Sequence, residues 1–322
     1  MSNLFETIES TIINQDKHIV FPEGQDERIL EAAGKLGAAG ILTPVLLGNK
    51  TNIKHKAEEI GVDVSASKIV DPAEFPEFEL MVETFVERRK GKATAEEARE
   101  LLQNENYFGT MLVYMNQADG LVSGAAHATA KTVRPALQII KTKEGIKKTS
   151  GVFIMVRGEE KYVFADCAIN IAPDSQDLAE IAVESGETAK LFDVDPRVAM
   201  LSFSTKGSAK SDETNKVVEA VKLAKEKNPD LVIDGEFQFD AAFVPSVAKK
   251  KAPDSVLEGK ANVFIFPSLE AGNIGYKIAQ RLGGFQAVGP ILQGLNQPVN
   301  DLSRGCNADD VYHLALITAA QS

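Results

Sequence analysis

The chain has 322 residues and a formal net charge of −11, from 35 basic and 46 acidic side chains. Its composition, 44% hydrophobic and 25% charged, is that of a globular protein and excludes long disordered stretches. The acidic balance argues against a nucleic-acid-binding protein, and no apolar run reaches the roughly 18 residues of a membrane span. The length indicates one large domain or two of medium size.

The cysteines and the N-terminal residues indicate the cellular compartment of the protein. Cys167 and Cys306 are the only two cysteines and lie far apart in the sequence. They form neither a disulfide framework nor a zinc-site spacing, which fits a reducing compartment. The first residues lack a basic segment followed by an apolar run. We therefore expect a cytoplasmic protein with no membrane partner.

Short apolar runs alternate with amphipathic stretches in the first part of the chain. In the first of these stretches Ile29, Ala33 and Leu36 share one helical face. Strands that alternate with helices favour a mainly parallel sheet covered on both faces. Strands are predicted at residues 18–21, 41–47, 68–70 and 118–122, and helices at residues 25–36, 52–60 and from Arg134 to Lys141.

A predicted hairpin interrupts this alternation of strands and helices, because two apolar runs are joined by the turn Arg157-Gly158-Glu159-Glu160. The alternation then resumes, so a domain boundary is expected near Lys148. The Gly- and Pro-rich residues 283–298 are interpreted as a connection, and the apolar helix at 308–320 as buried. The remaining predicted elements are strands at 151–156, 161–165, 198–203, 231–233 and 263–266, and helices at 175–192 and 212–225.

The first candidate for chemistry is the stretch from Ser123 to Thr129, which follows a strand and opens a helix. Ligands of open α/β sheets bind beyond the carboxyl ends of strands, and free amides at a helix start attract anions. Ser123 and Thr129 add donors, and Arg134 in the next helix has a guanidinium suited to a phosphate. On local pattern alone, an ordinary turn with a solvent-exposed His127 fits as well.

Two further stretches give weaker signals. Residues 202–208 carry hydroxyls, a lysine and a glycine but lack the Walker spacing, so they are interpreted as a polar loop. Residues 234–240 cluster acids without a calcium-loop pattern, and we expect a strand-end turn and a helix cap there. The basic runs at 88–90 and 249–251 are interpreted as solvated faces.

Residues 300–310 pack a hydroxyl, a guanidinium, a thiol and three carboxylates around one glycine. Asn307 is a favourable N-cap, and Asp310 stands where a capping-box acid would. Helix capping explains these two residues. It does not explain Ser303, Arg304 and Cys306 beside them.

Several segments together resemble phosphate acetyltransferases (phosphotransacetylases), in order along essentially the whole chain. They are Phe21-Pro22-Glu23-Gly24 and residues 118–127, 133–140, 166–170, 234–236 and 300–306. The resemblance implies reversible acetyl transfer between coenzyme A and inorganic phosphate, without a metal or a permanently bound cofactor. It implies an α/β fold of two domains with mainly parallel sheets, like isocitrate and isopropylmalate dehydrogenases, and an active site in the interdomain cleft. The expected domains are residues 1–148 with 289–322, and residues 149–288, in a homodimer.

The resemblance also implies roles for single residues. Asp310 matches the proposed general base, and Ser303 the residue placed near the thiol. Arginines that hold phosphate or coenzyme A are matched by Arg304, Arg134 and Arg88, although Arg89 is adjacent. The remaining residues expected to bind substrate are Ser123, His127, Thr129, Asn300 and Cys306.

Proton affinities limit the mechanism. A thiol has a pKa of about 8.5 and an unperturbed aspartate about 3.9, so full proton transfer between them costs about 6 kcal/mol. Arginines and Ser303 must therefore also stabilise charge in the transition state. We expect direct attack by the coenzyme A thiol in a ternary complex; the alternative is an acetyl-Cys306 intermediate.

Three other functions stay open at this stage. A phosphate butyryltransferase-like enzyme differs only in its acyl group, and nothing in the sequence sizes the acyl pocket. An oxidoreductase of the same fold would need a metal site and a dinucleotide site, and GxGxxG is absent. A silent binding domain is disfavoured by the intact Ser303, Arg304 and Asp310.

Overall fold

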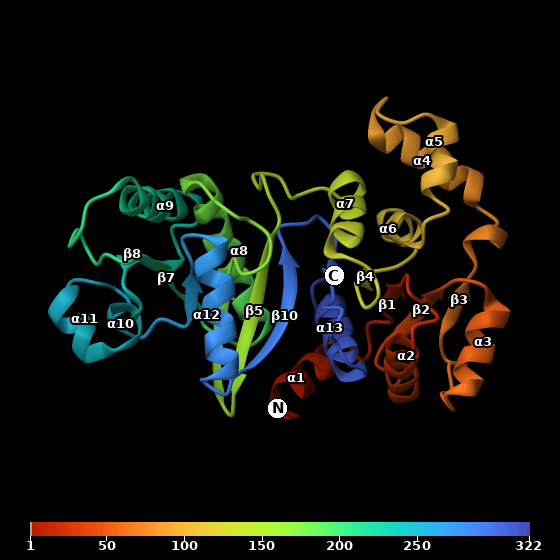
Figure 1. The fold of residues 1–322 in the computed structure, drawn as a ribbon, viewed down its shortest axis with the longest axis horizontal. Helices are drawn as coiled ribbons and strands as arrows, with labels where there is room; N and C mark the ends of the chain where they lie inside the picture. The colour runs from red at the N-terminus through yellow and green to blue at the C-terminus, as the bar shows by residue number, and fades with distance from the viewer. Residues whose placement is uncertain (1) are drawn as a thin grey trace. The chain divides into compact units, whose positions relative to one another are not determined.

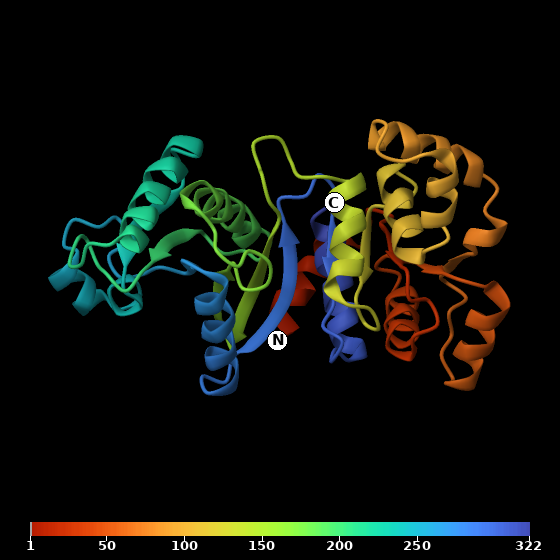
Figure 2. The same ribbon diagram turned by 45° about the horizontal axis from the view of Figure 1, so that its top comes forward.

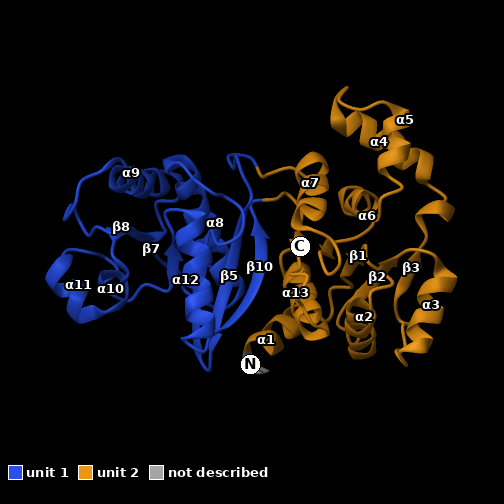
Figure 3. Cartoon of the chain, viewed as in Figure 1, with its two compact units in different colours: residues 1, 144–294 blue, residues 2–143, 295–322 orange. Residues whose placement is uncertain are grey.

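The computed structural model describes residues 2–322, which fall into two compact units (Figure 3). Unit 1 holds residues 144–294, and unit 2 holds residues 2–143 and 295–322. The chain thus leaves unit 2 near residue 143 and returns near residue 295. No helix of the described residues is long and apolar enough to cross a membrane.

Unit 2 is built on a five-stranded sheet in the order β11-β4-β1-β2-β3. Every pair of neighbours is parallel, as the alternation of strands and helices predicts. The strand β11 comes from the last part of the chain and pairs with β4, so that Asp301 lies opposite Ser123. The strands are β1 (His18–Phe21), β2 (Thr43–Leu47), β3 (Lys68–Val70), β4 (Gly120–Ser123) and β11 (Val299–Asp301).

Helices cover both faces of this sheet (Figures 1 and 2). Gly120 of β4 lies against Thr318 of α13, whereas Gly109 of α6 lies against Val20 and Leu121. Adjacent strand residues point to opposite faces, so α13 and α6 lie on opposite sides. The helices of unit 2 are α1 (Ser2–Ile12), α2 (Glu27–Ala39), α3 (Lys50–Glu59), α4 (Phe78–Arg89), α5 (Ala95–Leu101), α6 (Glu105–Tyr114), α7 (Thr129–Ile139) and α13 (Ala308–Ala320), with the 3₁₀ turn η1 (Pro72–Glu74).

Local patterning accounts for the two helices nearest the loops that follow β1 and β11. In α2, Asp26 caps the first turn, and the predicted face of Ile29, Ala33 and Leu36 is fully buried. The helix α13 begins and ends at the predicted residues, and most of its side chains are buried because it packs on β4 and α2. Both predictions are confirmed.

Unit 1 holds a six-stranded sheet in the order β10-β5-β6-β9-β7-β8. The predicted hairpin is confirmed: β5 and β6 are antiparallel, with Arg157 opposite Glu160. The pairs β6–β9, β9–β7 and β7–β8 are parallel. The strands are β5 (Ser150–Arg157), β6 (Glu160–Ala165), β7 (Arg197–Leu201), β8 (Val232–Phe237), β9 (Val263–Ile265) and β10 (Gln286–Gln293); the helices are α8 (Ser175–Leu191), α9 (Asp212–Lys227), α10 (Phe239–Phe243), α11 (Pro245–Lys251) and α12 (Leu269–Arg281).

The interpretation of residues 283–298 as a connection is wrong, because they contain β10, which pairs antiparallel with β5. The pairing register shifts between Val288 and Ile291, where Gly289 and Pro290 stand. A bulge is where a strand accommodates proline and glycine, so these residues mark an irregular strand. Ile291 is fully buried.

The expected turn and cap at residues 234–240 are also wrong. Asp234 and Glu236 lie inside β8, and Gln238 precedes α10 without a side-chain cap. The acids have other partners: Asp234 pairs with Lys206, and Glu236 accepts from the Gly207 amide. Residues 202–208 form a polar loop, as predicted, and the structure adds that this loop folds around the buried carboxylate of Glu236.

A buried side chain fixes β10 to the rest of unit 1. Gln293 is 3% exposed, and its amide donates to Ser150 Oγ at 3.0 Å and Ser185 Oγ at 2.9 Å. Its Oε1 accepts from Thr188 Oγ1 at 2.8 Å. One side chain therefore satisfies three buried hydroxyls, each costly to leave unpaired.

Replacing Gln293 by alanine is expected to cost about 2–4 kcal/mol of unfolding free energy, because three buried hydroxyls lose their partner. Gln286, at the other end of β10, is a matched control, since its buried Oε1 has no hydrogen-bond partner in residues 2–322. Urea unfolding of Gln293→Ala and Gln286→Ala measures the difference. Equal losses would show that the network contributes nothing specific.

Candidate active site

Three loops meet at the carboxyl edge of the unit 2 sheet. They follow the neighbouring strands β1, β4 and β11, and comprise residues 22–26, 124–128 and 302–306. The carboxyl edge of a parallel sheet is where α/β proteins bind ligands. Every residue that the sequence analysis proposed for the site lies on these loops or elsewhere in unit 2.

A buried carboxylate organises the loop after β4. Glu23 is 8% exposed, and it accepts hydrogen bonds from the amides of Gly124 at 3.0 Å, Ala125 at 2.8 Å, Ala126 at 2.8 Å and His127 at 3.0 Å. Both carboxylate oxygens are thereby acceptors. The loop before α7 is folded around an anion that belongs to the protein itself.

This geometry changes how the stretch 123–129 works. Its amides were expected to attract a substrate anion, but Glu23 already occupies four of them. These four amides are therefore not available to a substrate anion. Ser123 is fully buried, whereas Thr129 is exposed at the first turn of α7 and His127 is partly exposed.

Arg28 ties the three loops together. From the first turn of α2, it donates to Asp26 at 2.7 Å and to the carbonyl oxygen of Ala125 at 2.7 Å. Its other terminal nitrogen donates to the carbonyl oxygens of Arg304 at 2.9 Å and Cys306 at 3.3 Å. One guanidinium thus fixes the loop after β11 against the loop after β4.

The loop after β11 presents its polar side chains to solvent. Ser303, Arg304 and Asp310 are all exposed. The predicted capping box is confirmed: Asn307 accepts from the Asp310 amide at 2.9 Å, and the Asp310 carboxylate accepts from the Asn307 amide at 3.0 Å. The cap fixes the position of the carboxylate and leaves it accessible.

The thiol of Cys306 lies inside this arrangement. It is 9% exposed, and Arg28 Nη1 lies 3.7 Å from Sγ. Burial raises the pKa of Cys306, and Asp310 and Glu23 raise it further against the opposing effect of Arg28. The group is therefore held as a thiol, which is the weak form for nucleophilic attack.

Asn300 and Asp301, at the end of β11, are core residues. Asn300 is fully buried and donates to Thr318 Oγ1 at 2.9 Å, which ties β11 to α13. Asp301 is 1% exposed, and burial raises its pKa. A Cβ on Gly124, whose φ is +109°, would lie 2.5 Å from Asp301 Oδ1. A glycine is thus required where the two loops touch.

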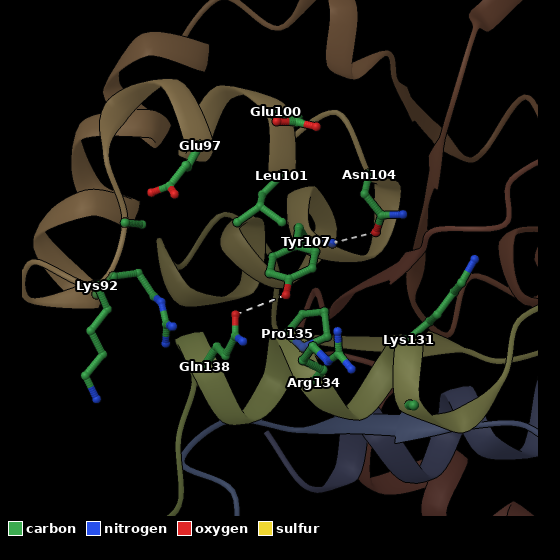
Figure 4. A pocket seen from close by; sticks show the side chains of 13 residues that line it. Lys92, Glu97, Glu100, Leu101, Asn104, Tyr107, Lys131, Arg134, Pro135 and Gln138 are labelled. Carbon is green, nitrogen blue, oxygen red and sulfur yellow. Dashed lines mark hydrogen bonds between the residues drawn. The ribbon is translucent and has the colours of Figure 1, made fainter.

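A pocket of about 760 Å³ opens between α4, α5, α6 and α7 (Figure 4). Four basic and two acidic side chains line this pocket, although the whole chain has a net charge of −11. Tyr107 donates to Gln138 at 3.0 Å on its wall. Burial raises the pKa of Tyr107, and Arg134 and Arg89 oppose that shift. The charged lining residues are Arg89, Lys92, Lys131, Arg134, Glu97 and Glu100.

Arg88 and Arg89 have different environments. Arg88 donates to the carbonyl oxygens of Ile139 at 2.6 Å and Ile140 at 2.9 Å, and lies 4.8 Å from the centre of the Tyr114 ring. It therefore binds the C-terminal end of α7, where a cation is favourable. Arg89 lines the pocket with Arg134. Of the two, Arg89 is the one placed to meet a ligand.

Glu23 and Arg28 had no predicted role, and Arg89 was only the neighbour that left the choice of Arg88 open. Glu23 acts across 101 residues of sequence, so no local pattern predicts its contacts. Arg28 does give a signal: a cation in the first turn of a helix opposes the helix dipole, which indicates that other contacts hold it there. Within residues 2–322, no three His, Cys, Asp or Glu side chains are grouped to hold a metal ion.

Comparison with known proteins identifies the class. Residues 3–319 match the phosphate acetyl/butaryl transferase family. The chain is 72% identical to the phosphate acetyltransferase of Bacillus subtilis strain 168, with 100% of both chains covered. A phosphotransacetylase structure from Streptococcus pyogenes is 58% identical, covers 100% of this chain and 98% of its own, and superposes with a TM-score of 0.98. A second, from Staphylococcus aureus, is 61% identical, covers 99% and 98%, and has a TM-score of 0.95.

The chain belongs to the phosphate acetyl/butaryl transferase family of enzymes. Its fold extends beyond that family. The 4-hydroxythreonine-4-phosphate dehydrogenase of Klebsiella pneumoniae is 12% identical, with 95% and 98% of the two chains covered, and has a TM-score of 0.57. The predicted α/β fold with two mainly parallel sheets, of the dehydrogenase-like type, is confirmed.

Replacing Glu23 by glutamine tests the organisation of the site loops. A glutamine has one acceptor and turns N–H groups toward backbone N–H groups, so we expect a loss of roughly 2–3 kcal/mol of unfolding free energy and a large loss of activity. Glu31→Gln, an exposed change in α2, serves as the control and should alter neither. An unchanged Tm for Glu23→Gln would contradict the structure of this loop.

Proposed function

We propose that this chain catalyses acetyl-CoA + phosphate = coenzyme A + acetyl phosphate, by direct attack of the coenzyme A thiol on acetyl phosphate in a ternary complex. The choice of reaction rests on 72% sequence identity, over the full length, to a phosphate acetyltransferase. The exposed Ser303, Arg304 and Asp310 on a loop fixed by Arg28 support this choice.

Arg304 is the proposed phosphate ligand. Its guanidinium is exposed, and it forms no ion pair within residues 2–322, so its charge is available to an anion. The planar fork suits a phosphate oxyanion. Ser303 stands beside it, with its Oγ accepting from the Gly305 amide at 3.3 Å, and its hydroxyl proton is then a donor for developing charge on sulfur or phosphate.

Asp310 is the proposed general base for the thiol. Because its carboxylate is exposed in the free chain, the protein alone does not desolvate it, and bound substrates must do so. Arg304 and Ser303 carry the remaining stabilisation. Cys306 is left without a covalent role, because its thiol is buried and its pKa is raised.

The pocket between α4 and α7 is the proposed site for the phosphate-bearing end of coenzyme A. Arg89, Lys92, Lys131 and Arg134 supply positive charge there. Local positive potential on an acidic protein concentrates an anionic ligand. Ser123, Thr129 and Asn300, also expected to bind substrate, are proposed to differ in role: Thr129 is accessible, whereas Ser123 and Asn300 are fully buried and support the loops.

The test is coenzyme A-dependent consumption of acetyl phosphate by the purified chain, without metal or nicotinamide cofactor. Formation of acetyl-CoA is expected. Enzyme mixed with acetyl phosphate alone should carry no acetyl group on Cys306 by mass spectrometry. NAD-dependent reduction without acyl transfer would overturn the proposed reaction, and a stoichiometric Cys306 adduct would overturn direct attack.

Asp310→Asn separates the base from the cap. A lost base should slow kcat roughly 10²–10⁴-fold, with little change in stability. A lost cap contact should cost about 0.5–2 kcal/mol of unfolding free energy. Asp309→Asn is the control, since Asp309 shares the helix turn and pairs with Lys35 at the surface. If Asp310→Asn is destabilised but keeps kcat, Asp310 is a cap alone.

Arg89→Ala is expected to raise the KM for coenzyme A roughly 10-fold or more, because a charge-assisted contact to a phosphate is lost, while the KM for acetyl phosphate changes little. Arg88→Ala is the matched control: it should lower stability through lost contacts to α7 and leave the KM for coenzyme A nearly unchanged. A raised KM for coenzyme A in Arg88→Ala, with an unchanged KM in Arg89→Ala, would instead place Arg88 at the ligand.

A homodimer is proposed through α12. Ile274, Ile278 and Leu282 recur at helical spacing and are 58%, 53% and 86% exposed, whereas the opposite side of the helix packs through Tyr276 against Phe153. An exposed apolar stripe of this kind is typical of a subunit interface. Ile278→Arg should convert a dimer to a monomer in light scattering; a wild-type monomer would contradict the proposal.

The cytoplasm is the proposed location, and coenzyme A the proposed substrate, with no permanently bound cofactor. Cys167 and Cys306 are unpaired, which fits a reducing compartment.

A further inference from the structure

The helices α4 and α7 of unit 2 end close together, and Arg88 joins their ends. Its guanidinium, in the last turn of α4, donates to the carbonyl oxygens of Ile139 at 2.6 Å and Ile140 at 2.9 Å. Lys141 is the next residue, so it follows α7 at the point where α4 ends. Five basic side chains gather here and are called the junction cluster: Arg88, Arg89, Lys90, Lys92 and Lys141.

No acidic side chain compensates the junction cluster. The charged groups that act on Lys141 are the four other members of the cluster, and all of them are positive. None of the five forms an ion pair with the residues that the structure describes. The chain as a whole has a net charge of −11. A group of uncompensated cations on an acidic chain is a place to which anions are attracted.

The backbone at Lys141 is fixed. Its N–H donates to the Ala136 carbonyl oxygen at 2.9 Å, and its own carbonyl oxygen accepts from the Asn296 N–H at 3.0 Å. The side chain is partly buried. Burial and the neighbouring cations both disfavour the protonated amine, and together they lower the pKa of Lys141. A larger share of the amine is therefore neutral, and the neutral amine is the nucleophilic form.

We propose that Lys141 is a modification site, at which the side-chain amine takes the acetyl group of acetyl phosphate. This inference rests on the proposed function, which makes acetyl phosphate the product of the chain itself. The neutral Nζ attacks the acyl carbon, an N–C bond forms, and the C–O bond to phosphate breaks. Phosphate leaves with the bonding electron pair and takes up the proton that the amine loses, so no further reactant is needed.

Two properties of the junction cluster act together in this step. Acetyl phosphate is an anion, so the uncompensated positive charge raises its concentration beside Lys141. The same charge keeps more of the amine in the form that attacks. Lys148 has the opposite surroundings, because its Nζ lies 2.7 Å from the buried Asp177 carboxylate, which raises the pKa of Lys148. A lysine of that kind keeps its proton.

Acetylation of Lys141 has a consequence for the neighbouring pocket. An acetylated amine carries no charge, so the junction cluster loses one of its five cations. Arg89 and Lys92 belong both to the cluster and to the pocket proposed to bind the phosphate-bearing end of coenzyme A. The positive potential that attracts coenzyme A therefore falls. Accumulated acetyl phosphate would thus weaken coenzyme A binding by the enzyme that makes it.

The modification is measured by incubating the purified chain with acetyl phosphate, without coenzyme A, and following each lysine by peptide mass spectrometry. Lys141 should be acetylated at least about fivefold faster than Lys54, an exposed residue of α3, because only Lys141 has the cluster around it. Lys148, paired with Asp177, should react more slowly than Lys54. A rate at Lys141 no greater than that at Lys54 overturns the proposal.

Lys90→Glu places an acid in the junction cluster and leaves Lys141 intact. Lys90 is exposed at the end of α4. The new carboxylate should favour the protonated amine and repel acetyl phosphate, which brings acetylation of Lys141 to within about twofold of Lys54. Lys50→Glu, the same change at an exposed position of α3, should leave the rate at Lys141 unaltered. A Lys90→Glu variant that is folded by circular dichroism, yet acetylated at the wild-type rate, contradicts the role of the cluster.

The effect on activity is measured as the KM for coenzyme A, after treatment with acetyl phosphate and removal of the reagent. In the wild type this KM should rise about threefold, in step with the fraction of Lys141 that is acetylated. Lys141→Arg keeps the charge but offers no lysine amine, so its KM should not respond to treatment. Lys141→Gln should show the raised KM without treatment. An equal rise in the wild type and in Lys141→Arg would assign the effect to another lysine and overturn the consequence proposed for Lys141.

The outcomes separate this inference from the proposed reaction. The acetylation rates use added acetyl phosphate and need no turnover by the enzyme. If the chain makes no acetyl phosphate from acetyl-CoA and phosphate, the proposed function fails, while the rates at Lys141 and Lys54 still decide whether Lys141 is a modification site. If the reaction proceeds as proposed but the two lysines react equally fast, the inference about Lys141 is wrong.

Discussion

The carboxylate of Glu23 is the constraint on which the rest of the site depends. Four consecutive amides donate to it, and without this acceptor the buried amides of Gly124 and Ala125 would be left without partners. The loop 124–128 therefore has one conformation. Arg28 donates to the Ala125 carbonyl oxygen in that loop and to the carbonyl oxygens of Arg304 and Cys306, so it fixes residues 304–306 against the loop. The side chains of Ser303, Arg304 and Asp310 are exposed, yet hydrogen bonds fix the backbone that carries them.

The same device recurs in unit 1, where Asp166 accepts from the amides of Ala168, Ile169 and Asn170, and Glu236 accepts from the Gly207 amide. Buried acids thus fold the loops that follow the strands, while Arg89 and Arg134 line a pocket and Arg304 is exposed. The division explains how a chain of net charge −11 has a pocket lined by four basic side chains.

The sequence predicted most strands, the helix at 308–320 and its capping box, because these depend on local periodicity and on residues three apart. It missed β10, because Gly289 and Pro290 break the pattern while pairing with a distant strand supplies the hydrogen bonds. At the site, the roles of Ser303, Arg304 and Asp310 came from a resemblance and stay predictions. Glu23 and the separation of Arg88 from Arg89 required the three-dimensional contacts, since no spacing along the chain encodes them.

The chain order of β11 and α13 has a consequence for biosynthesis. Residues 295–322 complete the sheet that residues 2–143 begin, and β11 pairs with β4 at the edge where the loops meet. A ribosome therefore releases the whole of unit 1 before unit 2 has its last strand and helix. Until then β4 presents an unpaired edge and an uncovered apolar face, which are the features that nascent chains expose to chaperones. Because Ser303, Arg304 and Asp310 belong to residues 295–322, the loop proposed to carry the chemistry takes its place only after the whole of unit 1 has been synthesised.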